Sequence, residues 1–108
     1  MTTPKLNQLL RELKQELQKL YGDQLVALIL YGSYARGEAH EDSDLDVAMI
    51  LTDYERAPVE ISRTSEIASR LSLDYDQLVA LIPLREKDWR EKRSFFLSNL
   101  REEGIEIS

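Results

Sequence analysis

An uninterrupted apolar run, LVALILY at residues 25–31, most constrains what this chain can fold into. The run is short, contains β-branched residues and follows a break at Gly22. A short apolar run without polar alternation is typical of a strand buried on both faces. The run therefore predicts a central strand of a sheet.

A second strand is predicted over residues 44–51, after a Gly-Ser pair and a polar loop. Side chains alternate between the two faces of a strand, so Asp44 and Asp46 are expected to point the same way. Residues 34–38, between these two predicted strands, predict a short helical turn that Gly37 closes.

The remaining segments predict helices around these strands. Leucines at helical spacing predict a first helix, with Thr3 as its cap and Gly22 at its exit. A weaker helix is predicted from Pro58 to about residue 71, and a last helix from about residue 86 to Gly104.

A third strand is predicted over residues 74–82, where Pro83 would stop it because proline lacks the amide that a central ladder requires. Residues 105–107 could add a short terminal strand. The order helix, strand, strand, helix, strand, helix predicts an α/β or α+β domain, with helices packed on a small sheet.

The length and composition limit the classes of function. The 108 residues predict one domain, 1–108, and the net charge of −6 argues against tight nonspecific binding to nucleic acid. The absence of cysteine excludes disulfides, a thiolate zinc site and cysteine nucleophiles. No apolar run is long enough for a membrane span, and the amino terminus is not a signal sequence, so we expect a cytoplasmic protein.

Gly32 and Ser33 have the chemistry of a phosphate-binding turn. Glycine lets the backbone approach a ligand, exposed amides at the start of a helical turn point toward an anion, and the Ser33 hydroxyl can add a hydrogen bond. A simpler interpretation is a strand-to-helix turn capped by serine. The pair alone does not distinguish the two.

Asp44 and Asp46 favour a metal site next to that turn. Residues two apart on a strand are roughly 6.6 Å apart along it, so the two carboxylates can converge on one or two divalent cations, and they would repel each other without a cation. Carboxylate oxygens without histidine or thiolate suit Mg²⁺ or Mn²⁺. The alternative is a solvated acidic start of a strand, but one metal–triphosphate site would explain both motifs.

The motifs resemble a known superfamily. Gly32-Ser33, followed after ten intervening residues by Asp44-x-Asp46, resembles the signature of the polymerase-β-like nucleotidyltransferases, and GSYARG with SDLD resembles their minimal (MNT) branch. The resemblance implies that Asp44 and Asp46 hold two Mg²⁺ ions, and that Gly32 and Ser33 hold the β and γ phosphates of ATP. It also implies a third carboxylate at the start of the third strand.

The third carboxylate and the role of Arg36 each leave two alternatives. Asp74 and Asp76 both fit the third catalytic and metal-binding carboxylate, and we favour Asp76 because it adjoins the apolar run. Arg36 could bind a phosphate or could pair with a carboxylate of the loop or site.

The resemblance also predicts a partner. Larger members of the superfamily carry a further domain that presents the acceptor, for which 108 residues leave no room. The MNT proteins of HEPN/MNT toxin–antitoxin modules transfer AMP from ATP to a tyrosine of a HEPN ribonuclease toxin. We therefore expect a Mg²⁺-dependent protein adenylyltransferase antitoxin, or alternatively an idle binding module that neutralises its HEPN partner by complex formation alone.

Overall fold

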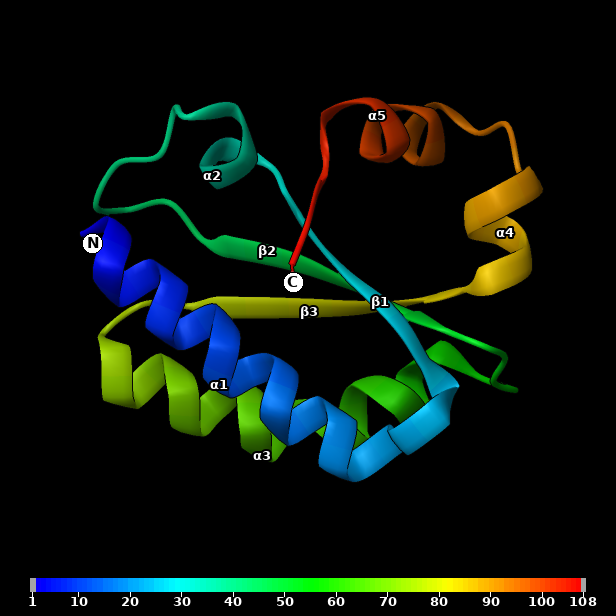
Figure 1. Cartoon of the computed structure of the whole chain (residues 1–108), viewed down its shortest axis with the longest axis horizontal. Helices are drawn as coiled ribbons and strands as arrows, with labels where there is room; N and C mark the ends of the chain where they lie inside the picture. The colour runs from blue at the N-terminus through cyan, green and yellow to red at the C-terminus, as the bar shows by residue number, and fades with distance from the viewer. Residues whose placement is uncertain (1, 108) are drawn as a thin grey trace.

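A four-stranded sheet with helices on both faces makes up the computed structural model, which describes residues 2–107 (Figure 1). The elements in chain order are α1 (Thr3–Tyr21), a 3₁₀ turn (Gly22–Gln24), β1 (Leu25–Tyr31), α2 (Ser33–Arg36), β2 (Leu45–Leu51), α3 (Ala57–Tyr75), β3 (Val79–Arg85), α4 (Glu86–Glu91), α5 (Phe95–Glu103) and β4 (Ile105–Glu106). The expected α/β architecture is confirmed. No helix within residues 2–107 is long and apolar enough to cross a membrane.

The sheet has the strand order β3-β2-β1-β4, so the two apolar runs of the sequence occupy its centre. β1 pairs antiparallel with β2 and with the short β4, whereas β2 and β3 are parallel, joined through α3. Tyr31 at the end of β1 and Ala80 in β3 are both opposite Asp46. The sheet is therefore mixed, and one end of it brings the end of β1 next to the start of β2.

The two faces of the sheet carry different amounts of core. α1 and α3 cover the larger core, which includes Leu28 of β1 together with Val47 and Met49 of β2. The opposite face carries a smaller core, in which Ala48 and Ile50 pack with α5 (Figure 1). Side chains two residues apart on a strand point to the same face, so Asp46 lies on the α5 face with Ala48 and Ile50, beyond the end of the small core.

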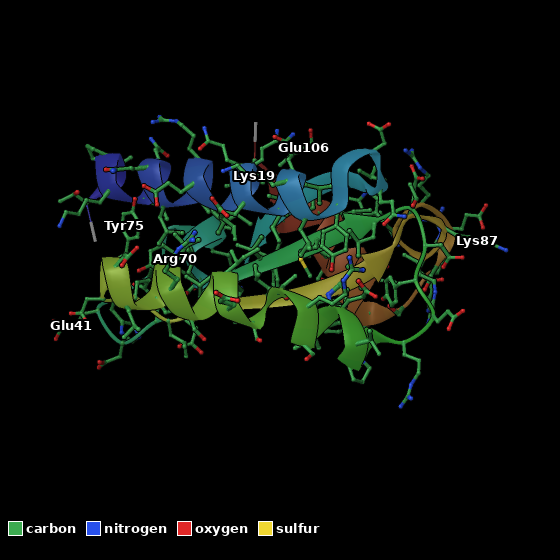
Figure 2. The ribbon with its side chains drawn as sticks, turned by 90° about the horizontal axis from the view of Figure 1, so that it is seen from below. Lys19, Glu41, Arg70, Tyr75, Lys87 and Glu106 are labelled. Carbon is green, nitrogen blue, oxygen red and sulfur yellow. The ribbon has the colours of Figure 1, made fainter. Side chains whose placement is uncertain are left out.

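α1 and α3 lie side by side over the larger core (Figure 2). Leu9, Leu13 and Leu17 of α1 are fully buried, as the leucine spacing predicts. A buried polar contact also joins the two helices, because the Tyr21 hydroxyl donates to Glu60 Oε1 at 2.8 Å. This layer supports the sheet on the face opposite Asp46.

The third strand differs from its predicted position. α3 continues to Tyr75, beyond the predicted end near residue 71, and β3 starts only at Val79. β3 also runs through Pro83 to Arg85, so the prediction that Pro83 stops the strand was wrong. β3 is an edge strand, where proline is tolerated, and the Pro83 carbonyl accepts a hydrogen bond from the Tyr54 hydroxyl at 3.0 Å.

The ends of two helices also differ from their predicted positions. Thr2, not Thr3, caps α1, with its hydroxyl accepting from the Lys5 amide at 3.4 Å. The single last helix divides into α4 and α5, because Ser94 starts a new helix by accepting from the Leu97 amide at 3.1 Å. Gly22 is the C-cap of α1, and the short terminal strand is present as β4, both as predicted.

Candidate active site

The Gly-Ser pair forms a sharp turn from β1 into α2. Gly32 has φ 76° and ψ −155°, a conformation that is essentially restricted to glycine. The amides of Ala35 and Arg36 donate to the Gly32 carbonyl at 3.1 and 3.2 Å, which closes the turn, and Gly37 ends it in the left-handed conformation. This is the short helical turn that the sequence predicts.

The Asp-x-Asp motif lies directly beside this turn. Asp44 precedes β2 and is exposed, whereas Asp46 is within β2 and half-buried. A Cβ atom added to Gly32 would lie 2.5 Å from Asp46 Oδ2, so the backbone of the turn touches that carboxylate. Gly32 is thus required twice, for its positive φ and for this close approach.

The electrostatics of the pair fit a site that is completed by a cation. Burial raises the pKa of the Asp46 carboxyl above its usual value, and the negative charge of Asp44 raises it further. The positive charge of Arg36 acts in the opposite direction. Burial and the charge of Asp46 also raise the pKa of Tyr31 to about 12. A hard divalent cation would relieve the repulsion between the aspartates, and their oxygens are the ligands it prefers.

A cavity of about 260 Å³ opens next to Gly32, between the end of β1 and α5. Its walls include the aromatic rings of Tyr31 and Phe96, which pack edge to face with centroids 5.8 Å apart. Arg36 also lines it, and its guanidinium lies 3.3 Å from Glu38 and 3.8 Å from Glu103. Arg36 therefore pairs with carboxylates in the structure, which is one of its two predicted roles. Phosphate binding by Arg36 stays a prediction.

Gln77 holds the two motifs together, a role that the sequence did not reveal. Its side chain is buried; the oxygen accepts from the Tyr34 hydroxyl and the nitrogen donates to the Ser43 carbonyl, both at 2.6 Å. Tyr34 belongs to the α2 turn, and Ser43 immediately precedes Asp44. The amide thus fixes the separation of the turn from the aspartates. The only sequence signal for it is a polar residue before an apolar run.

Asp74 and Asp76 are not on β3, where the prediction placed them. Asp74 is in the last turn of α3, and Asp76 is its C-cap, with φ 49°. Asp76 lines a hollow with Glu41, Asp42 and Lys5. Within residues 2–107, no group of three His, Cys, Asp or Glu side chains is close enough to hold a metal ion. The structure therefore brings Gly32, Ser33, Asp44 and Asp46 together but not Asp76, whose catalytic role stays a prediction.

The fold and the site define a class of protein in which a Gly-Ser turn after one strand lies beside a pair of carboxylates at the start of the antiparallel neighbouring strand. Comparison with known protein families supports this class: a family described as "Nucleotidyltransferase domain" matches residues 10–103. The chain belongs to this nucleotidyltransferase family, as the motifs indicate.

A relative in Methanocaldococcus jannaschii carries the provisional name protein adenylyltransferase MJ0141. It is 31% identical over 100 residues, which cover 93% of this chain and 96% of that protein.

Solved structures have the same fold. One chain, from a structure described as a toxin–antitoxin with AMP-PNP, superimposes with a TM-score of 0.62 at 24% identity, over 89% of this chain and 70% of that chain. Another comes from a complex of a tri-AMPylated Shewanella oneidensis HEPN toxin with an MNT antitoxin. Its TM-score is 0.57 at 22% identity, over 94% of this chain and 71% of that chain.

Proposed function

We propose that this protein transfers AMP from ATP to a tyrosine of a HEPN-type ribonuclease toxin, and so acts as its antitoxin. The observation that carries the proposal is the contact between the Gly32 backbone and the Asp46 carboxylate. That contact sets the Gly-Ser turn directly against Asp46 of the aspartate pair. The adenylyltransferase name of the relative and the HEPN complex of the structural neighbour support the acceptor.

Asp44 and Asp46 are the residues that would hold Mg²⁺, and Gly32 and Ser33 would hold the β and γ phosphates. Mg²⁺ held by these carboxylates would neutralise charge on the triphosphate and lower the pKa of the acceptor hydroxyl. The acceptor oxygen forms a bond to the α-phosphorus while the bond from that phosphorus to the bridging oxygen breaks, and pyrophosphate leaves. The proton of the hydroxyl passes to water; its transfer to Asp76 stays a prediction, because the structure does not bring Asp76 to the aspartate pair.

The test incubates the protein with Mg²⁺, α-labelled ATP and the HEPN protein encoded by a neighbouring gene. We expect label on a tyrosine of the HEPN protein, and we expect it to disappear in the Asp44→Asn/Asp46→Asn double variant. An intact partner that stays unlabelled by the wild-type protein, while the two proteins form a complex, would refute the transfer. The proposal also places the protein in the cytoplasm, where ATP and the RNA substrates of a ribonuclease are found.

The separation of Asp76 from the aspartate pair favours a second candidate, a module that neutralises its HEPN partner by binding alone. The same double variant distinguishes the two functions. Full neutralisation of the ribonuclease by Asp44→Asn/Asp46→Asn, with no label transferred, is the result that this candidate predicts.

A further inference from the structure

The order of the strands determines the side from which an acceptor must arrive. Gly32 and Ser33 follow β1, on one flank of the aspartate pair, and β3 lies on the other flank. Phosphoryl transfer proceeds with the attacking and leaving oxygens in line. If pyrophosphate leaves toward Gly32 and Ser33, the acceptor must approach over the start of β3.

That approach leads over an exposed apolar surface. Leu78 immediately precedes β3, and its carbonyl accepts from the Leu45 amide at 2.8 Å, which places it beside Asp44. Its exposed fraction is 59%, and that of Leu73, at the end of α3, is 83%. Both leucines line a groove of about 380 Å³ between α3 and β3. We call Leu73, Leu78 and this groove the β3 patch.

Acidic residues lie next to the two leucines of the β3 patch in the sequence. Asp74 and Asp76 are exposed within the segment that joins its two leucines. Glu41 and Asp42 share a hollow with Asp76, in which Lys5 is the one basic side chain within residues 2–107. Figure 2 places Glu41 at the same end of the molecule as Tyr75, with Lys87 at the opposite end. An apolar centre with a polar, solvent-accessible rim is the usual anatomy of a protein–protein interface. Here Asp74 and Asp76 give the rim between the leucines a negative charge.

We infer that the β3 patch is the docking surface for the acceptor protein, a partner with apolar side chains at the centre of its contact and basic residues around them. The inference rests on the proposed function for the identity of the partner. A ribonuclease fits the charge, because binding of RNA phosphates requires Lys and Arg. Docking there brings the acceptor hydroxyl to the flank from which in-line attack is possible.

The test measures binding of the HEPN partner by calorimetry, with Leu73→Ser and Leu78→Ser as separate variants. Phe95→Ser is the matched control, because Phe95 is 85% exposed but lies on α5. We expect each leucine variant to raise the dissociation constant about tenfold or more. The control should stay within about twofold, and higher salt should weaken binding of the wild type.

Folding of each variant is checked by its thermal shift with Mg²⁺-ATP, which should match that of the wild type because neither leucine is part of the nucleotide site. Wild-type affinity in both leucine variants would overturn the inference, as would loss of binding in Phe95→Ser alone or no binding by the wild type. Failure of the proposed function would give a different result from failure of this inference: the partner would bind through the β3 patch but would not receive AMP.

Discussion

Replacement of Gly32 by alanine tests the contact on which the site depends. The added Cβ would lie 2.5 Å from Asp46 Oδ2, closer than such atoms approach, so the carboxylate must move. The backbone conformation also disfavours any side chain, at a cost of about 1–3 kcal/mol. The clash and the strain are separate effects, and a control can separate them.

The displacement of Asp46 should reduce catalysis more than stability. A separation near 3.4 Å is ordinary contact, so the carboxylate would shift by about 1 Å, and a misplacement of that size can cost about 10²-fold in rate. The loss of stability should lower the melting temperature by about 4–8 °C for each kcal/mol. We therefore expect Gly32→Ala to fold and to transfer AMP about 100 times more slowly.

Gly22→Ala is the control, because Gly22 also has a positive φ, 56°, but nothing lies within 4 Å of its added Cβ. It should lose stability without losing the rate of AMP transfer, measured with labelled ATP under single-turnover conditions. Equal rates for Gly32→Ala and the wild type, with Gly32→Ala folded at the assay temperature, would refute the role of this contact.

Three further predictions concern ligand binding, pH and the support of the sheet. Mg²⁺-ATP at 100 times its dissociation constant should stabilise the protein by about 2.7 kcal/mol, measured by thermal shift; a shift that persists in Asp44→Asn/Asp46→Asn would contradict the site. Because the pKa of Asp46 is raised in the fold, its ionisation destabilises the folded state as pH rises above the usual carboxyl value. Asp46→Asn should therefore have a higher melting temperature than the metal-free wild type at pH 7. This difference in melting temperature should shrink below pH 3.8, the ordinary pKa of this carboxyl, and a constant difference would argue against ionisation of Asp46 as its cause. Tyr21→Phe removes the hydroxyl that donates to buried Glu60, and should lower the free energy of unfolding in urea by about 1–3 kcal/mol. An unchanged urea midpoint would mean that Arg63, 3.0 Å from Glu60, satisfies the buried carboxylate by itself.

Local sequence determined much of the site. Gly32-Ser33 ends a strand and starts a turn because glycine permits the backbone conformation there. Asp46 lies on the face of Ala48 and Ile50 because strand side chains alternate, whereas Asp44 immediately precedes the strand. Both are properties of a few consecutive residues. The α/β class likewise followed from the order of apolar runs and leucine spacings, since each element carries its own period.

Tertiary structure decided what depends on partners distant in the chain. Asp76 could not be placed from the sequence, because the end of α3 and the start of β3 depend on how far both elements pack against the sheet. Pro83 fits into β3 only because β3 is an edge strand, and this depends on the strand order. The 2.6 Å bonds of Gln77 and the contact between Gly32 and Asp46 join segments that only the folded sheet brings together.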